Sequence, residues 1–406
     1  MSVQSVMPVV MSAIVDMVSE PCPGEDLEAG LPSSDLRAEW ARIEDPRDRR
    51  GRRHSLMVIF VLVQSAVVSG AVGFAAIRHW IGAAPQELLA EIGARQSRRT
   101  GRFEAPHPDT VCRVLTQVDM VQVDAAYARA RAAQLPDLYD DAEELIGVTV
   151  DGKTQRGTAH DDQRAQHRMG ALLAEDAITL AQLDVDGKTN EINAFAPLLD
   201  QIPDMTNMVV SADRMHTQRK HARYLHGRGA YFVLPVGDNQ PTLFDRLDAL
   251  DWKQVPVGWC TYDEGHGRRE VRTIQVRPAP ARLNFPHVKQ VLLLERHVFD
   301  LAWKPVSVEA VLGITSLSDL QAGPERIAGF VRGEWAIENR DHYVRDVTLG
   351  EDRCRVRTGS MPSVLAVMRS YTIGALRLLG FTNIAEGTRW ARDSFEHPLI
   401  ALGLTM

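Results

Sequence analysis

Apolar positions at helical spacing dominate the first third of the chain. Three segments show this pattern: residues 55–77, 85–92 and 110–133. The sequence His-Pro-Asp-Thr at 107–110 is typical of a helix start, with Asp109 or Thr110 placed to cap the first amides. We therefore predict a compact all-α domain over residues 37–135.

Residues 55–77 carry no charge over 23 positions, a length sufficient to span a bilayer. Serine, glutamine and glycine residues interrupt the stretch, and no second such segment follows it. A buried helix or pair of helices is therefore the better interpretation, and we expect no membrane partner. The N-terminus lacks the basic region of a signal peptide, and the four cysteines form no Cys-x-x-Cys pair. These features predict a cytoplasmic protein without disulfides or zinc.

From about residue 140 onward, apolar positions form short runs that alternate with polar ones, a pattern typical of β-strands. The runs predict strands over residues 145–150, 168–174, 178–185, 208–212, 230–236 and 308–315. Helices are predicted over residues 190–201, 214–227 and 324–345. Residues 241–305 are rich in proline, glycine and alternating positions, and predict a β-rich insertion. The order favours an α/β layered core over residues 140–406 rather than a doubly wound sheet.

Charge is distributed unevenly along the chain. The net charge is −7, but residues 1–36 carry six acidic residues and no Lys or Arg, which leaves −1 for the remainder. We predict that residues 1–36 form a weakly ordered acidic leader. Arginine is concentrated in four other places: residues 47–53, 95–102, 214–228 and 340–357. Local patches govern phosphate binding more than net charge does, so these clusters point toward nucleic acid, although solvation explains any single one.

Two acidic residues directly follow predicted strands. Asp151 comes after residues 145–150, and Asp213 comes after residues 208–212. Alternation places each acid on the same strand face as the hydroxyl residue two positions earlier. Each also has a structural explanation, because Asp-Gly is a common hairpin turn and Asp213 could cap the following basic helix. The Asp-Gly-Lys tripeptide recurs at 186–188, so the tripeptide alone does not select Asp151.

A third acidic residue, Glu338, falls on the long helix predicted over residues 324–345. An apolar stripe leads toward it: Ile327, Phe330, Val331 and Trp335. Val331 and Glu338 are seven residues apart and therefore lie on nearly the same side of a helix. A carboxylate that faces a core is expensive to desolvate unless it is paired or binds a metal. The alternative is a salt bridge with Arg345 or Arg332.

Three convergent carboxylates suit hard divalent cations, which prefer oxygen ligands and keep waters for a substrate phosphate. Two such ions about 3.5–4 Å apart activate the attacking oxygen and stabilise the leaving oxygen of an in-line displacement. Asp151, Asp213 and Glu338 therefore predict a site for two Mg²⁺ ions, with Mn²⁺ as a substitute.

Several motifs occur in a specific order along the chain. They are D-G-K-T-Q-R-G at 151–157, K-T-N-E-I at 188–192, S-A-D-R-M-H-T-Q at 211–218, H-G-R-R-E at 266–270, W-A-I-E-N-R-D-H-Y-V-R-D-V at 335–347 and E-D-R-C-R-V-R-T-G at 351–359. Together with D-P-R-D-R-R-G-R-R-H at 45–54, this set resembles bacterial insertion-sequence transposases of the ISAs type, within the DDE superfamily. That group includes the H-repeat-associated proteins. The resemblance covers roughly residues 35–406.

The resemblance implies a ribonuclease-H-like catalytic core with a β-rich insertion, preceded by an all-α DNA-binding domain over residues 37–135. It implies that Asp151, Asp213 and Glu338 are the catalytic and metal-binding acids, and it selects Asp151 over Asp186. The insertion would account for the gap of 125 residues between the second acid and the third.

The implied function is Mg²⁺-dependent DNA strand cleavage and strand transfer at the ends of an insertion sequence. Double-stranded DNA, at the element ends and at the target, is the expected partner, with the chain acting as a homo-oligomer. A catalytically decayed or repurposed DNA-binding protein is the alternative, and a nuclease without a joining step is a third interpretation. Residues 237–238 favour decay, because Gly-Asp stands where relatives tend to have Lys-Gly.

Basic residues close to the predicted acids in the sequence are candidates for DNA contact. They are Lys153, Lys188, Arg214, His216 and Arg345. For Arg345, a salt bridge is an equally good prediction. In the helical domain the candidates are the arginines of the first cluster: Arg49, Arg50, Arg52 and Arg53.

Overall fold

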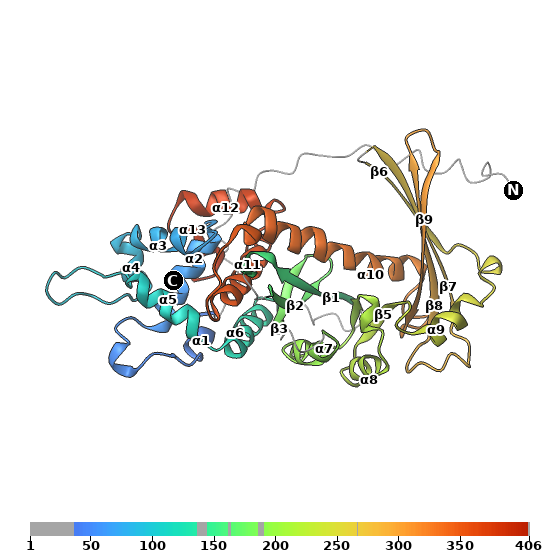
Figure 1. Cartoon of the computed structure of the whole chain (residues 1–406), viewed down its shortest axis with the longest axis horizontal. Helices are drawn as coiled ribbons and strands as arrows, with labels where there is room; N and C mark the ends of the chain where they lie inside the picture. The colour runs from blue at the N-terminus through green and yellow to red at the C-terminus, as the bar shows by residue number, and fades with distance from the viewer. Residues whose placement is uncertain (1–35, 136–143, 161–163, 186–190, 266, 405–406) are drawn as a thin grey trace.

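The computed structural model describes residues 36–135, 144–160, 164–185, 191–265 and 267–404. The predicted leader, residues 1–36, lies outside the described residues except for Leu36, which is fully buried and begins the first helix. The molecule is elongated, with helices gathered at one end and a large sheet that extends to the other (Figure 1).

The N-terminal helices pack around one helix that is buried on every side. This helix, α2 (Leu56–Val68), buries every residue except Met57 to a high degree. Around it lie α1 (Leu36–Ala41), α3 (Phe74–Gly82), α4 (Gln86–Glu91), α5 (Pro108–Gln117) and α6 (Met120–Ala133). The burial of α2 explains why residues 55–77 carry no charge. It also confirms the interpretation of this stretch as a buried helix, which is followed by a second helix, α3. No helix in the described part of the chain is both long and apolar enough to cross a membrane.

The C-terminal helices complete the same hydrophobic core. They are α11 (Met361–Leu378), α12 (Ile384–Asp393) and α13 (His397–Ala401), and each contacts α2. Gln64 of α2 donates to Met368 O at 3.1 Å and to Thr372 Oγ1 at 3.0 Å, both in α11. The same amide accepts the Tyr127 hydroxyl of α6 at 2.8 Å. The first and last parts of the chain therefore share one core, in which this buried polar group is fully satisfied.

The helix predicted over residues 110–133 is in fact two helices, because the chain leaves the helical conformation at Val118. The residue that caps α5 is His107, whose Nδ1 accepts the amide of Asp109 at 3.2 Å. The prediction of Asp109 or Thr110 as the cap was therefore wrong. Asp119 caps α6 in the same way, through an Oδ1 that accepts an amide at 2.9 Å.

One sheet of nine strands forms the rest of the fold. The strands are β1 (Ile146–Gln155), β2 (Gln166–Leu173), β3 (Ile178–Val185), β4 (Met208–Ala212), β5 (Tyr231–Val236), β6 (Trp259–Gly265), β7 (Arg268–Pro278), β8 (Gln290–Asp300) and β9 (Pro305–Thr315). Their order is β3-β2-β1-β4-β5-β9-β8-β7-β6. Strands β1, β4 and β5 are parallel, and all other neighbours are antiparallel.

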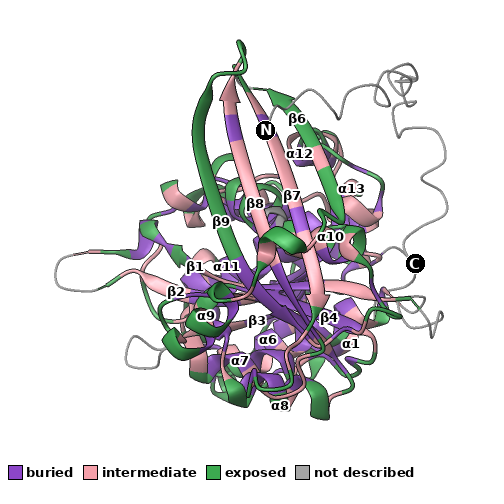
Figure 2. Ribbon diagram, turned by 90° about the vertical axis from the view of Figure 1, so that its right-hand side faces the viewer, coloured by how far each residue is buried: buried purple, intermediate pink, exposed green. Residues whose placement is uncertain are grey.

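The predicted insertion is therefore not a separate β unit. It begins with a helix, α9 (Pro241–Asp248), and its strands extend the central sheet through the pairing of β9 with β5. The outer part of β6–β9, residues 259–265, 268–273, 294–300 and 305–311, is called the blade. Figure 2 shows these half-buried and exposed strands projecting from the buried centre, and the first seven residues of β9 are all exposed.

Helices cover both faces of the central strands. Helices α7 (Glu191–Leu199) and α8 (Arg219–Gly227) pack on the face that carries Val148, Val210 and Phe232. Helix α10 (Pro324–Ala336) packs on the opposite face, where Val209 and Val233 contact its apolar side chains. The alternation of side chains along each strand thus supplies two separate cores.

A buried ion-pair network joins the helical end to the sheet. Arg168 of β2 is 1% exposed, and its Nη2 lies 2.5 Å from Asp124 Oδ1 of α6. Its Nη1 binds Asp184 of β3, which also accepts the Ser363 hydroxyl of α11 at 3.0 Å. Removing one member of such a network leaves a buried charge without a partner, which is strongly destabilising.

We predict that Arg168→Ala lowers the free energy of unfolding by about 3–5 kcal/mol, because Asp124 is then left buried and unpaired. Urea unfolding followed by far-ultraviolet circular dichroism measures this. The matched control is Arg95→Ala, whose partner Glu104 lies 3.2 Å away with both side chains about 40% exposed. The control change is expected to be under about 1 kcal/mol, and equal losses in the two variants would contradict the role of the network.

Candidate active site

Two of the predicted acids lie side by side at one end of the parallel strands. In the pairing of β1 with β4, Val150 is opposite Ala212, and the next residues are Asp151 and Asp213. Strand β1 continues to Gln155, so the first acid lies inside a strand rather than in a hairpin turn. The hairpin explanation for its Asp-Gly sequence is therefore excluded.

A glycine allows α10 to approach this pair of strands closely. Thr149 and Ser211 precede the two acids on the same face, and their Oγ atoms are 3.0 Å apart. A Cβ atom placed on Gly333 would lie only 3.1 Å from Thr149 Oγ1 and 2.8 Å from Ala174 Cβ. The absence of a side chain there brings the end of α10, and with it Glu338, toward the strand ends.

The prediction that Glu338 faces the core was wrong. Its side chain is 69% exposed. The buried stripe of the helix passes through Phe330 and Ile337, so Glu338 stands at the edge of that stripe. The salt-bridge alternative also fails, since among the described residues neither Arg345 nor Arg332 pairs with it.

Three side chains converge closely enough to hold one metal ion. Potential ligand atoms of Asp151, Glu338 and His342 all lie within 4.8 Å of one another. His342 Nδ1 is 3.8 Å from Asp151 Oδ2 and 3.8 Å from Glu338 Oε2. Asp213 is exposed on the adjacent strand end and lies outside this group, with its Oδ1 accepting the amide of Arg214.

His342 is the site residue that the sequence interpretation missed. The available signal was its position four residues after Glu338 in the same motif, which places the two on one side of a helix. Burial, with the nearby charges of Arg345 and Lys153, lowers the pKa of His342 to about 3. The imidazole is therefore neutral near pH 7, the form in which histidine binds metals.

The electrostatic environment of Asp151 favours a cation. Burial raises the pKa of Asp151 to about 6, against the opposing effect of a hydrogen bond from the Gly152 amide. The carboxylates of Glu338, Glu191 and Asp213 raise it further by repulsion. A divalent cation relieves such repulsion and accepts oxygen ligands, so the residues present fit a hard metal ion.

A fourth carboxylate beside the site is held by two histidines. Glu191 Oε1 lies 2.7 Å from His167 Nε2, and its Oε2 lies 3.7 Å from His216 Nε2. Hydrogen bonding to these two histidines lowers the pKa of Glu191 to about 2. His167 also contacts the Thr154 hydroxyl at 2.9 Å. Glu191 is therefore ionised near pH 7, and its charge adds to the repulsion that raises the pKa of Asp151.

The conserved-domain model "Transposase DDE domain" matches residues 144–370, and the model "DDE_Tnp_1-associated" matches residues 38–129. The chain belongs to the DDE transposase family. Members of this family typically use a divalent metal ion, in keeping with the acidic group of this transposase.

Two similar curated proteins are named as putative transposases. The chain is 25% identical over 349 residues to "Putative transposase YncI" of Escherichia coli O157:H7, covering 82% of this chain and 85% of that one. It is 25% identical over 349 residues to "H repeat-associated putative transposase YhhI" of Escherichia coli K12, covering 82% and 88%. A cryo-EM structure of the piggyBac transposase synaptic complex with hairpin DNA has a TM-score of 0.41 and 10% identity, over 90% of this chain and 78% of that chain.

Three of the predicted DNA contacts of this transposase are structural residues instead. Lys153 is 7% exposed and its Nζ lies 2.6 Å from Asp346 Oδ2. Arg345 is 3% exposed and binds Glu351 at 2.8 Å. His216 is 1% exposed beside Glu191. A buried and engaged side chain does not reach DNA in this conformation, which corrects these predictions.

The burial of Arg345 has a local cause. The chain forms π-helical turns over Ile337–His342 and Val344–Thr348. A π-helical turn holds more residues than an α-helical one, so residues seven apart no longer share a face. Glu338 is therefore exposed while Arg345 points into the protein. Lys188 lies outside the described residues.

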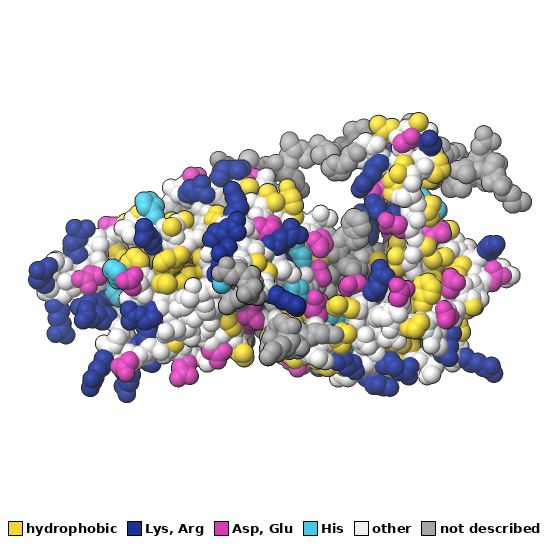
Figure 3. All heavy atoms as spheres, in the orientation of Figure 1, with side chains coloured by type: hydrophobic (Ala, Val, Ile, Leu, Met, Phe, Trp, Pro, Cys, Tyr) yellow, Lys and Arg dark blue, Asp and Glu magenta, His cyan; other side chains and the backbone are white. Residues whose placement is uncertain are grey.

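The arginines of the first cluster differ in their accessibility. Arg49, Arg50 and Arg53 are exposed, and none forms an ion pair within the described part of the chain. Arg52 is held more firmly, since it donates to Arg47 O at 2.8 Å and Asp45 O at 2.8 Å. Figure 3 shows basic side chains gathered over the helical end of the transposase.

Gly237 and Asp238, which stand where relatives tend to have Lys-Gly, lie next to Arg214. Of the basic residues predicted to contact DNA near the acids, Arg214 is the one that is described and exposed. A Cβ atom on Gly237 would lie 3.0 Å from Arg214 Cδ and 3.3 Å from its Nη1. The exposed arginine thus occupies the space beside this strand end, and Asn239 Nδ2 donates to its carbonyl at 2.6 Å. Positive charge is retained there despite the missing lysine, although exposed Asp238 opposes it.

The raised pKa of Asp151 makes a prediction about stability. The folded-state pKa of about 6 exceeds the unfolded value of 3.8, so the stabilising contribution is present below pH 3.8 and lost as pH rises through 6. Without metal, we expect Asp151→Asn to raise the free energy of unfolding by about 2 kcal/mol at pH 7.5. The gain should vanish near pH 4. Asp213→Asn is the matched control, with no expected gain because that acid is exposed. Urea titrations at the two pH values measure both variants, and a gain that does not depend on pH would contradict the assignment.

Proposed function

We propose that this transposase catalyses Mg²⁺-dependent DNA strand cleavage and strand transfer at the ends of an insertion sequence. The observation that supports it best is the convergence of Asp151, Glu338 and His342 within 4.8 Å beside the strand end that carries Asp213. Oxygen-rich sites of this kind suit Mg²⁺, with Mn²⁺ as a substitute. The same geometry supports a ribonuclease-H-like core, in which adjacent parallel strands and a helix across them present the acids.

Asp151, Asp213 and Glu338 are the proposed catalytic acids and would hold two Mg²⁺ ions. When bound, the ions supply Lewis-acid stabilisation of charge on the attacking and leaving oxygens of the scissile phosphate. Asp151 must lose its proton to act as a ligand, and neutral His342 is available as a further ligand. Buried Lys153 and Arg345 hold the surrounding backbone in place through their ion pairs.

The reaction we propose has two steps at the same acids. In the first, water attacks the phosphorus at the element end, the P–O3′ bond breaks, and a free 3′-OH remains. In the second, that 3′-OH attacks a phosphate of the target, forming one phosphodiester bond as another breaks. Each step is an in-line displacement, so positioning of the phosphate and charge stabilisation are the main demands on the protein.

Double-stranded DNA at the element ends and at the target is the proposed partner. Exposed Arg49, Arg50 and Arg53 at the helical end supply phosphate contacts, and Arg214 supplies one beside the acids. Because two ends must be cut and joined together, we propose that the transposase acts as a homo-oligomer on DNA.

A catalytically decayed DNA-binding protein is the second candidate. Asp238 is the observation in its favour, since an exposed carboxylate near the strand ends repels phosphate. The proximity of Asp151 and Glu338 to the strand end that carries Asp213 favours the active enzyme. Cleavage measurements separate the two.

We predict that Asp151→Asn, Asp213→Asn and Glu338→Gln each reduce cleavage below detection while leaving affinity for end DNA largely intact. The reason is that each change removes a carboxylate ligand but no phosphate contact. A supercoiled plasmid that carries the element's inverted repeats, incubated with Mg²⁺, measures cleavage and joining. Asp238→Asn is the matched control and should keep cleavage, with equal or tighter DNA binding. Cleavage retained by any of the three variants would remove that residue from the catalytic set.

His342→Ala should raise the Mg²⁺ concentration needed for half-maximal cleavage by roughly 10–100-fold, as expected for a residue that completes or orients a metal site. A Mg²⁺ titration of the plasmid assay measures this. The control is His297→Ala in the blade, whose imidazole contacts Glu295 at 3.3 Å. An unchanged Mg²⁺ requirement in His342→Ala would show that the imidazole only fills space.

A further inference from the structure

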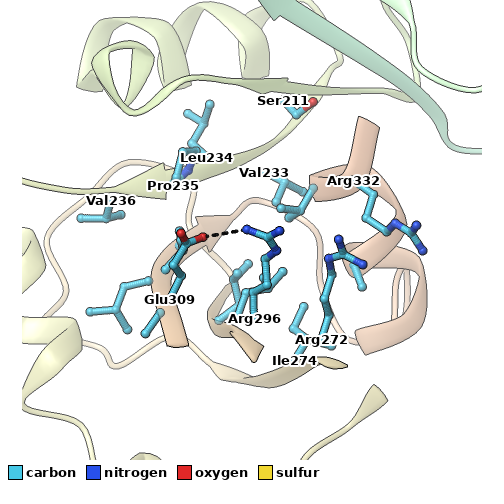
Figure 4. A pocket seen from close by; sticks show the side chains of 18 of the residues that line it. Ser211, Val233, Leu234, Pro235, Val236, Arg272, Ile274, Arg296, Glu309 and Arg332 are labelled. Carbon is cyan, nitrogen blue, oxygen red and sulfur yellow. Dashed lines mark hydrogen bonds and ion pairs between the residues drawn. The ribbon is translucent and has the colours of Figure 1, made fainter. Parts of the chain in front are cut away.

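A cleft of about 570 Å³ begins beside Asp213 and runs along the insertion. Asp213 and Arg214 line one end of it, and its walls are β5, α10 and the inner face of the blade. Figure 4 shows Arg272, Arg296 and Arg332 lying side by side, across from the side chains of β5. The cleft therefore opens beside one of the proposed catalytic acids.

Five arginines line the cleft, against three carboxylates, those of Asp213, Asp238 and Glu309. Arg272 and Arg296 are already paired with a carboxylate, because both bind Glu270 on the inner face of the blade. The other three arginines that line the cleft, Arg214, Arg332 and Arg340, are not neutralised in this way. Arg332 is 54% exposed and lies 3.6 Å from its nearest carboxylate partner, Asp263. Arg214 and Arg340 form no ion pair within the described part of the chain, although Arg340 Nη1 donates to the carbonyl of Glu175.

The cleft also has an apolar wall with an aromatic side chain at its surface. Trp259 is 39% exposed at the start of the edge strand β6, and Val331, Ile274 and Leu294 line the same space. An indole face stacks on any base, and guanidinium groups bind phosphate oxygens. Trp259 and Arg332 therefore offer the two kinds of contact that an unpaired nucleotide makes.

We propose that this cleft binds unpaired nucleotides of the DNA strand that continues past the scissile phosphate. The inference rests on the proposed function, since it places the strand relative to the catalytic acids. A cavity of this size accommodates a ligand of drug-like dimensions, which corresponds to one or two nucleotides and not to a duplex. Bases contact Trp259 and the apolar wall, and phosphates contact Arg214, Arg332 and Arg340.

The test compares two fluorescein-labelled probes with the full-length chain. One is a blunt DNA duplex, and the other is the same duplex with a short tail of unpaired thymidines at the 3′ or 5′ end. Fluorescence anisotropy in Ca²⁺, in place of Mg²⁺, measures Kd without chemistry. We expect one of the tails to tighten binding roughly tenfold, in line with base stacking on an aromatic side chain.

Variants identify the cleft as the source of the gain. Trp259→Ala and Arg332→Ala should each lose most of the gain from the tail while binding the blunt duplex as before, which also reports correct folding. Trp259→Phe should restore it, because a phenyl ring still stacks. Arg326→Ala is the matched control, as Arg326 is an exposed arginine of the same helix that does not line the cleft.

The outcomes separate this inference from the proposed function. A tail that gives no gain in the wild-type chain, while the plasmid is still cleaved, overturns the cleft assignment alone. A gain that survives both alanine substitutions also overturns it. In a third outcome, the wild-type chain does not cleave the plasmid, but the tail still tightens its DNA binding and the alanine variants lose this gain. That result overturns the proposed reaction and supports the cleft as a single-strand site.

Discussion

The parallel pairing of β1 with β4 is the constraint on which the candidate site depends. It places Asp151 and Asp213 at the same end of adjacent strands, a relation that no short loop can produce. The third acid arrives because α10 crosses these strands at close range, where Gly333 replaces the side chain that would collide with Thr149. A bulkier residue at that position would separate the helix from the strands and Glu338 from its partners. The site is therefore a product of packing between two layers.

Electrostatic repulsion among the acids is a feature of this site. Glu191 is held ionised through its contacts with His167 and His216, so its negative charge adds to the repulsion. Burial, together with repulsion from Glu338, Glu191 and Asp213, raises the pKa of Asp151 to about 6. This repulsion lowers the stability of the folded protein, but it also creates a region of negative charge that attracts cations. Such a loss of stability is common at functional sites. Neutral His342 fits the same purpose, since it adds a ligand without adding charge.

Helix α10 connects the acids to the basic cleft. Its buried stripe packs on the central strands, its end carries Glu338, and its opposite edge presents Arg332 to the space below the blade. The nine-stranded sheet makes this possible, because β9 continues from β5 and carries the blade into contact with the helix. A shift of α10 would change the spacing of the acids and the shape of the cleft together. The proposed metal site and the proposed nucleotide site are thus parts of one structural unit.

The sequence by itself predicted most of the helices and strands up to residue 240, the buried nature of α2 and the apolar runs that lead to Asp151 and Asp213, because periodicity is a local property. Family motifs were needed to choose Asp151 over a second Asp-Gly-Lys. Only the tertiary structure decided that the insertion extends the central sheet, that His342 joins the acids, and that Lys153 and Arg345 are buried in ion pairs. These outcomes depend on which distant elements pack together and on π-helical turns that shift the helical register. Neither factor is encoded in the spacing of residues along one helix or strand.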